Sequence, residues 1–141
     1  MEEKMIKNLE QNYVSVVLVI NDDDDSQVEK KIKEIKKVLD NNFKSSEIVI
    51  VDNTTKVDSL ESLKSLNFKH TEIKLPIKHR TQQALNAGTA IAIGDYIVEI
   101  EDISFDIDYN KIIEMYRKSQ EGYDFVSVSY THLTLPTSDL V

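Results

Sequence analysis

The chain has 141 residues, a formal charge of −8 at pH 7 and no cysteine, and 40% of its residues are hydrophobic. This length fits one domain or part of one, and the acidic balance argues against nucleic acid as a partner because a phosphate backbone attracts clustered lysine and arginine. The lack of cysteine excludes disulfides, and no apolar run approaches the ~20 residues of a membrane-spanning helix.

Strands and helices are expected to alternate from the start of the chain. Residues 1–12 are expected to form a helical lead-in, too polar and acidic for a signal peptide. Residues 13–20 are almost continuously apolar and β-branched, which predicts a strand covered on both faces. Ser26 and Glu29 have capping-box spacing, and apolar residues then recur every three or four positions, which predicts an amphipathic helix at 26–42. The next expected elements are a buried strand at 47–51 and a short helix at 58–66.

The second half continues the alternation. A weaker strand is expected at 71–75, and an alanine-rich helix at 81–93 is expected to end at Gly94. The elements expected after it are a strand at 96–100, a helix at 108–120 and a strand at 125–128. Strands that alternate with helices predict an α/β fold, a mostly parallel open sheet with right-handed crossovers and helices on both faces.

The last twelve residues differ in character from the rest. Residues 130–137, YTHLTLPT, closely resemble the translation of a transposase sequencing-library adapter. We therefore expect 130–141 to be a non-native tail, 13–129 to be a partial domain, and the natural protein to continue beyond it. The alternative is that the tail is a genuine edge strand and loop.

Polar residues follow three of the predicted strands. Asn21 follows the first, Asp52 and Asn53 end the second, and Glu101 and Asp102 follow the fourth. The carboxyl ends of parallel strands meet at one edge of an open α/β sheet, where such proteins bind ligands. The sequence therefore predicts a site there for a phosphorylated ligand accompanied by a cation.

Arg80 comes just before the alanine-rich helix. Its guanidinium could bind a diphosphate through two parallel hydrogen bonds, and the helix amino terminus would add partial positive charge. The alternative is a solvated arginine beside Lys78 and His79. For Asn53 the alternative is a turn residue that tolerates left-handed backbone geometry.

Three segments together resemble the amino-terminal half of a family 2 glycosyltransferase with the GT-A fold: VSVVLVIND at 14–22, EIVIVDNTTKVD at 47–58, and residues 80–104. The resemblance implies a Rossmann-like, nucleotide-sugar-binding half that transfers a sugar from a nucleoside diphosphate to a hydroxyl of a glycan, lipid or protein acceptor. The catalytic base would lie beyond the fragment, which would be inactive alone. The expected location is the cytoplasm, with the inner membrane surface as an alternative for the full-length protein.

The resemblance also implies roles for single residues. Asn21 would lie beside the nucleotide and Asp52 would accept a hydrogen bond from the base or ribose, while Asn53 takes the place of a second aspartate. The family's Asp-x-Asp motif, which holds Mn²⁺ or Mg²⁺, aligns with residues 101–103. Because isoleucine cannot coordinate a cation, Ile103 leaves Asp102, helped by Glu101, as the candidate metal ligand.

Two alternative functions follow from the same residues. A non-catalytic GT-A-like pseudo-enzyme or binding module would explain the loss of the last acid at Ile103. A receiver-like doubly wound domain would need a phosphorylatable aspartate after the third strand, where this chain has Pro76.

Overall fold

The computed structural model describes residues 8–22, 27–55, 61–104, 107–122, 125–128 and 131–134. They form a six-stranded sheet with the order β3-β2-β1-β4-β6-β5. Its four parallel strands are β1 (Glu10–Ile20), β2 (Phe43–Asp52), β3 (Thr71–Lys74) and β4 (Tyr96–Ile100), and the antiparallel ones are β5 (Phe125–Val128) and β6 (Thr131–Thr134). The helices are α2 (Val28–Asn42), α3 (Thr81–Ile91), α4 (Lys111–Ser119) and the short 3₁₀ helix η1 (Glu61–Ser65). The expected mostly parallel α/β fold is confirmed.

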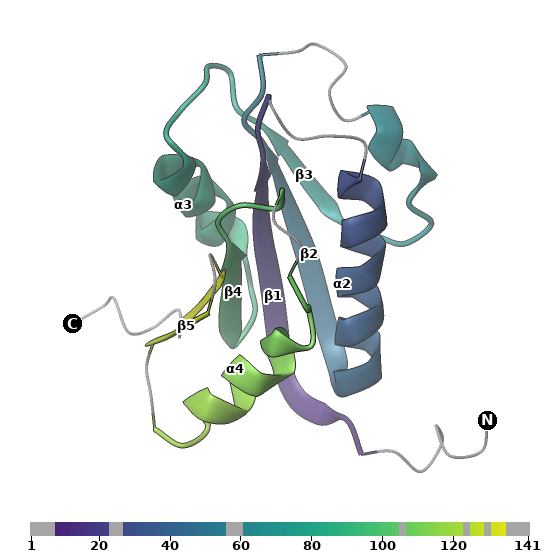
Figure 1. Ribbon diagram of the computed structural model, residues 1–141, viewed down its shortest axis with the longest axis vertical. Coiled ribbons are helices and arrows are strands. Elements are labelled where there is room, and N and C mark those ends of the chain that lie inside the picture. The colour runs from purple at the N-terminus through teal and green to yellow at the C-terminus, as the bar shows by residue number, and fades with distance from the viewer. Residues whose placement is uncertain are drawn as a thin grey trace.

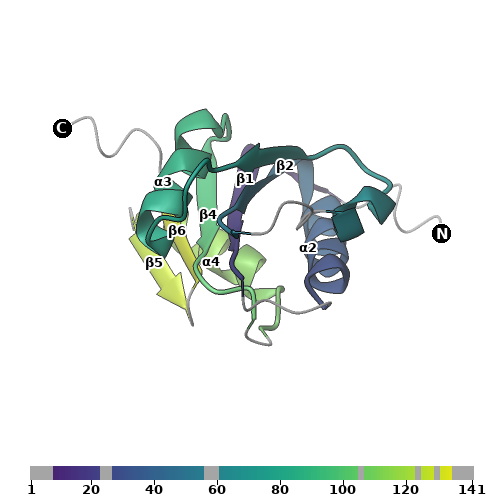
Figure 2. The same ribbon diagram turned by 90° about the horizontal axis from the view of Figure 1, so that it is seen from above.

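The helices cover both faces of the sheet, as predicted (Figures 1 and 2). Successive side chains of a strand point to opposite faces, and both faces of β1 are apolar. Val16 and Leu18 belong to the core cluster shared with α2 and α4, whereas Val17 and Val19 pack with Ala84 of α3. This double burial explains the near-continuous apolar run of β1. No helix within the described ranges is both long and apolar enough to cross a bilayer.

Several predicted boundaries need correction. The first strand begins at Glu10, so residues 10–12 are not helical, and β2 begins at Phe43 rather than at 47. Helix α3 ends at Ile91 with Ala92 as its C-cap, so Gly94 does not terminate it. Residues 1–7, Ser26 of the expected capping box and residues 56–60 lie outside the described ranges.

Gly94 is required for a different reason. A Cβ at this position would lie 2.5 Å from Ser15 Oγ and 2.9 Å from the carbonyl oxygen of Tyr13. The glycine therefore lets the turn before β4 approach the backbone of β1 closely.

The end of the chain forms an antiparallel pair. β5 was expected to continue the parallel order, but it pairs antiparallel with β6, which lies between β4 and β5. Leu133 of β6 is fully buried in the core cluster that contains α2 and α4. Residues 131–134 of the expected tail thus take part in the sheet, while the assignment of 130–141 as non-native stays a prediction.

Candidate functional site

A cavity of about 810 Å³ lies where three segments meet. They are the residues after β1, the segment that leads into α3, and the residues after β4. Because β1 and β4 are parallel neighbours, their carboxyl ends reach the same edge of the sheet. The residues that line the cavity are Asn21, Asp22, Lys78, His79, Arg80, Thr81, Glu101 and Asp102.

The structure brings together four of the six residues predicted from the sequence. Asn21, Arg80, Glu101 and Asp102 line the cavity. The other two, Asp52 and Asn53, are 2% and 1% exposed and do not line it. Sequence reasoning left out four lining residues: Asp22, Lys78, His79 and Thr81. The sequence could have indicated them only through their position, because each one directly adjoins a predicted site residue or another member of the run 78–81.

Asn53 connects two walls of the cavity. Its side-chain amide donates to Asn21 Oδ1 at 3.0 Å and to the carbonyl oxygen of His79 at 2.8 Å. Its Oδ1 accepts a hydrogen bond from the backbone N–H of His79 at 2.8 Å. An ionised aspartate could only accept hydrogen bonds. The asparagine therefore fits this position because the contacts around it need both donors and an acceptor.

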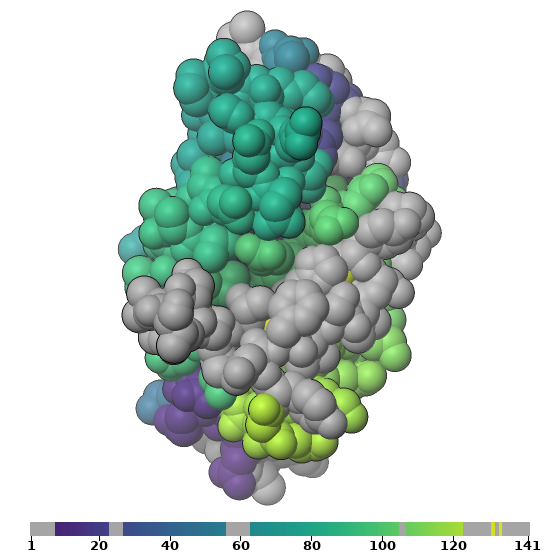
Figure 3. Space-filling view, turned by 90° about the vertical axis from the view of Figure 1, so that its left-hand side faces the viewer, coloured from purple at the N-terminus to yellow at the C-terminus, as the bar shows by residue number. Residues whose placement is uncertain are grey.

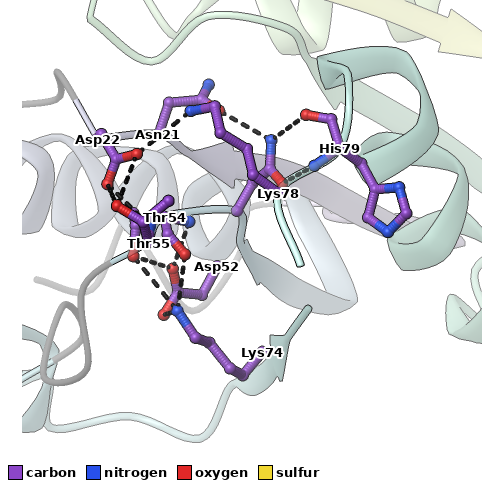
Figure 4. Close-up of polar contacts among 9 residues, drawn as sticks. Asn21, Asp22, Asp52, Thr54, Thr55, Lys74, Lys78 and His79 are labelled. Atoms are coloured by element: carbon purple, nitrogen blue, oxygen red, sulfur yellow. Dashed lines mark hydrogen bonds and ion pairs between the residues drawn. The ribbon is translucent and has the colours of Figure 1, made fainter. Parts of the chain in front are cut away.

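Asp52 is buried and bonds to Thr54 and Lys74 (Figure 4). Its Oδ1 accepts from the backbone N–H of Thr54 at 2.9 Å and from the Thr54 hydroxyl at 2.7 Å. Its Oδ2 lies 3.2 Å from Nζ of Lys74. Thr54 and Lys74 line a second cavity of about 370 Å³, and Lys78 lines both cavities. Asp52 thus orients two residues of the adjoining hollow.

Asp22 brings a fixed negative charge to the cavity wall. Its Oδ1 accepts from the backbone N–H of Thr55 at 2.9 Å, and its Oδ2 lies 3.4 Å from Nζ of Lys78 (Figure 4). The pKa of Asp22 is lowered, first by the hydrogen bond from the Thr55 backbone, then by the Thr55 hydroxyl and by Lys78, against an opposing effect of desolvation. The carboxylate is therefore ionised at neutral pH.

The segment that leads into α3 forms a basic wall. Lys78, His79 and Arg80 are consecutive, and Arg80 is the exposed N-cap residue of the helix. Its backbone N–H donates to the side chain of Gln83 at 3.3 Å. The helix amino terminus adds partial positive charge at the same place. This wall has the donors and the charge to bind an anion.

The residues after β4 form the opposing acidic wall. Glu101 and Asp102 line the cavity, and Asp102 Oδ1 accepts from the backbone N–H and the hydroxyl of Ser104. Ile103 is fully buried in the hydrophobic core. Its side chain occupies the protein interior, so the position aligned with the last motif acid does not contribute to the cavity.

Glu99 also has a structural role. Its carboxylate accepts a hydrogen bond from the Thr89 hydroxyl of α3 at 2.8 Å, and it does not line the cavity. Glu99 therefore connects β4 to the helix that covers it.

The acidic wall offers the type of ligand that a hard divalent cation prefers. Magnesium is commonly bound through one or two carboxylates, with phosphate and water completing the shell. Glu101 and Asp102 supply such carboxylates. Within the described residues, no three His, Cys, Asp or Glu side chains are grouped to hold a metal ion by themselves. The donor set fits a cation that shares its ligands with a bound phosphate.

Comparisons with known proteins place the fold. Searches found no matching family model and no matching curated protein. Among solved structures, S. aureus TarS 1-349 superposes with a TM-score of 0.62 at 14% identity, over 89% of this chain and 47% of that one. The mannosyltransferase PcManGT from Pyrobaculum calidifontis, solved with GDP-Man and Mn²⁺, gives 0.53 at 16% identity, over 69% and 31%.

A third similar structure is glucosyl-3-phosphoglycerate synthase from Mycobacterium tuberculosis, solved with Mn²⁺, UDP and phosphoglyceric acid. Its TM-score is 0.50 at 20% identity, over 63% of this chain and 32% of that one. This chain spans less than half the length of each of the three. The combination of parallel sheet, covering helices and these neighbours gives the chain a Rossmann-like α/β fold of the GT-A type.

Proposed function

We propose that this chain binds a nucleoside-diphosphate sugar as part of a glycosyltransferase that transfers the sugar to an acceptor hydroxyl. The observation that carries the proposal is the cavity at the carboxyl ends of β1 and β4. Arg80 and two further basic residues line one wall, and Glu101 and Asp102 line the other. Structures with the same type of fold hold GDP-Man or UDP together with Mn²⁺.

In this proposal the diphosphate lies against the basic wall. Arg80 can bind phosphate oxygens through its fork of N–H donors, and Lys78 can add a second positive charge. Asp102, with Glu101 beside it, would hold a Mn²⁺ or Mg²⁺ ion. When bound, the ion would neutralise charge on the departing diphosphate.

We propose that the nucleoside extends toward the smaller cavity beside Lys78. Asn21 would lie next to the nucleotide, and Asn53 would keep Asn21 and the backbone of His79 in place. Asp52 stays our candidate for the base or ribose contact. Since Asp52 is 2% exposed, this contact requires either a shift of its partner Lys74 or indirect action through Thr54.

The reaction also needs an acceptor site and, for an inverting enzyme, a carboxylate base that deprotonates the acceptor. We propose that both come from protein outside these 141 residues, which span less than half of each similar structure. The 141-residue chain should therefore bind the donor nucleotide without turning it over.

Isothermal titration of the 141-residue chain with UDP and with GDP, each with and without MnCl₂, tests the proposal. We expect binding of at least one nucleotide, strengthened by Mn²⁺. Arg80→Ala should weaken binding in both conditions, whereas Asp102→Ala should remove only the gain from Mn²⁺. Arg117 and Asp40, which are exposed and do not line the cavity, supply the matched alanine controls. If neither UDP nor GDP bound with or without MnCl₂, the result would instead favour a non-catalytic binding module.

A further inference from the structure

Helix α2 contains one lysine that differs from the others. Lys31 is 8% exposed, whereas Lys30, Lys33 and Lys37 of the same helix are exposed. Burying an ammonium group is costly unless hydrogen bonds replace its contacts with water. Here Nζ of Lys31 donates to the carbonyl oxygen of Ile103 at 2.9 Å and to that of Ser104 at 3.0 Å. The buried ammonium group thus donates hydrogen bonds to the carbonyl oxygens of the two residues that follow Asp102.

The same short segment is held in two further ways. The Ile103 side chain packs in the core cluster that includes Ile32 and Ile35 of α2. On the cavity side, Asp102 Oδ1 accepts from the backbone N–H of Ser104 at 3.0 Å and from its hydroxyl. The carboxylate that faces the cavity and the carbonyls that face Lys31 therefore belong to one compact turn. A displacement of those carbonyls would move Asp102 with them.

We propose that Lys31 is a positioning residue that anchors the turn at 102–104 to α2 and thereby sets the affinity of Asp102 for a divalent cation. The inference rests on the proposed function, because it assigns a cation to Asp102. Lys31 itself would contact neither the cation nor the nucleotide. Residues that orient a metal ligand from behind commonly change metal affinity by about 10- to 100-fold when they are replaced.

The Lys31→Met variant keeps an unbranched stem and removes the donors. In titrations with UDP or GDP, we expect the gain in affinity from Mn²⁺ to fall by about tenfold. Affinity without Mn²⁺ should stay within about twofold, since the basic wall lies on a different segment. Lys31→Arg, which keeps donors and charge, should recover much of the gain. Lys30→Met is the matched control because it removes an exposed lysine one position away.

Hydrogen exchange of the Ser104 amide provides a readout that does not depend on any ligand. This N–H donates to Asp102, so a loosened turn should exchange faster in Lys31→Met than in the wild-type chain or in Lys30→Met. If Lys31→Met unfolds at the assay temperature, Lys31→Gln replaces it. That substitution keeps a polar side chain but removes the positive charge that bonds to the carbonyls of Ile103 and Ser104, and it should also reduce the gain from Mn²⁺.

The outcomes separate the two proposals. If Mn²⁺ strengthens nucleotide binding equally in wild type, Lys31→Met and Lys30→Met, the role of Lys31 is overturned while the proposed function stands. If the wild-type chain binds no nucleotide, the proposed function fails, and hydrogen exchange then tests whether Lys31 anchors the turn at 102–104. Unchanged exchange at Ser104 in Lys31→Met would then reject the anchoring as well.

Discussion

At the amino-terminal end of β4, side chains of β1 and β2 bond to one another and to the turn that precedes the strand. Ser15 donates to Glu47 at 2.5 Å and accepts from the N–H of Gly94 at 2.8 Å, and Glu47 accepts from the N–H of Ile93 at 2.7 Å. At the carboxyl ends, by contrast, polar residues line an open cavity. Figure 3 shows one face of the molecule between these ends, with the teal α3 region above and the purple start of β1 at the bottom.

We call the end with the Ser15–Glu47 contacts the closed end and the end with the cavity the open end. The two ends therefore use similar polar groups differently. A hydroxyl or carboxylate whose hydrogen bonds are made inside the protein contributes to stability, whereas one that faces a cavity can bond to a ligand. We expect substitutions at the amino-terminal end to change the free energy of unfolding and leave nucleotide affinity unchanged. Substitutions on the cavity walls should do the reverse.

Gly94→Val should have the largest effect. A Cβ there would lie 2.5 Å from Ser15 Oγ and 2.8 Å from the backbone nitrogen of Ser15. Overpacking typically costs about 1–3 kcal/mol, and a clash with backbone that cannot rotate away should cost at least the upper figure. Urea denaturation followed by circular dichroism measures the loss. Ala90→Val, an exposed helical position, is the control, and equal stability of the two variants would contradict the close approach.

Asn53→Asp tests whether the two ends differ as described, because Asn53 lies at the open end but is buried and hydrogen-bonded inside the protein. A carboxylate oxygen would replace the amide nitrogen that faces Asn21 Oδ1 and the carbonyl oxygen of His79. We expect a loss of roughly 1–3 kcal/mol in unfolding free energy, together with weaker UDP or GDP binding because the 78–80 segment loses its anchor.

Acid should partly reverse this effect, since a protonated carboxyl regains one donor. Binding and stability of Asn53→Asp, measured from neutral pH to about pH 4 where carboxyl groups begin to protonate, should therefore approach the wild-type values. Asn67→Asp adds the same charge at an exposed position and is the control. A variant that keeps wild-type stability and affinity at neutral pH would show that Asn53 does not join the two walls.

The sequence predicted the strands well because their signal is local. Long β-branched runs such as that of β1 have few alternatives to a buried strand. The prediction that Gly94 ends the alanine-rich helix was wrong, because that helix ends at Ile91. The glycine is needed instead because Ser15 approaches it closely, and Ser15 is distant in sequence and meets it only in the folded sheet. The strand at 125–128 was predicted, but its antiparallel orientation was missed because its partner, residues 131–134, was set aside as part of the tail.

The candidate site shows the same limit. Placing Asn21, Glu101 and Asp102 at one edge required only the rule that parallel strands end together, and Arg80 was added from its place at the amino terminus of the alanine-rich helix. Whether a residue at that edge faces the cavity depends on contacts that the sequence does not reveal. Asp52 bonds to Lys74 from the adjacent strand, and Lys31 is one of several lysines in α2 until the fold places it behind Ile103.

Ser15→Ala should have a moderate effect confined to stability. It leaves the N–H of Gly94 and the carboxylate of Glu47 without the hydroxyl between them. The expected loss in unfolding free energy is about 1–3 kcal/mol, with nucleotide affinity unchanged. Ser45→Ala, an exposed serine of β2, should change neither quantity. Weaker nucleotide binding in Ser15→Ala would mean that the two ends of the sheet are coupled.

The smallest effects should appear in the pH dependence of stability, where the two ends respond in opposite directions. Near the closed end, burial and then the charge of Glu47 raise the pKa of Tyr13 above its ordinary value of 10.0. The folded chain keeps that proton where the unfolded chain has lost it, so this contribution is present below pH 10 and is lost as pH rises through the raised pKa. Tyr116, whose pKa is also raised by burial, adds to the same alkaline loss.

At the open end the sign reverses. The pKa of Asp22 is lowered from 3.8, so its contribution is present above that pH and is lost as pH falls through the lowered pKa. In melting temperatures measured against pH, Tyr13→Phe should therefore flatten part of the alkaline decline, and Asp22→Asn should flatten part of the acidic decline. Asp22→Asn is the control for the acidic limb, which Tyr13→Phe should leave unchanged because the phenol is neutral at acidic pH. If Tyr13→Phe altered the acidic limb, the closed and open ends would titrate as one network, and the separation between stability and binding would fail.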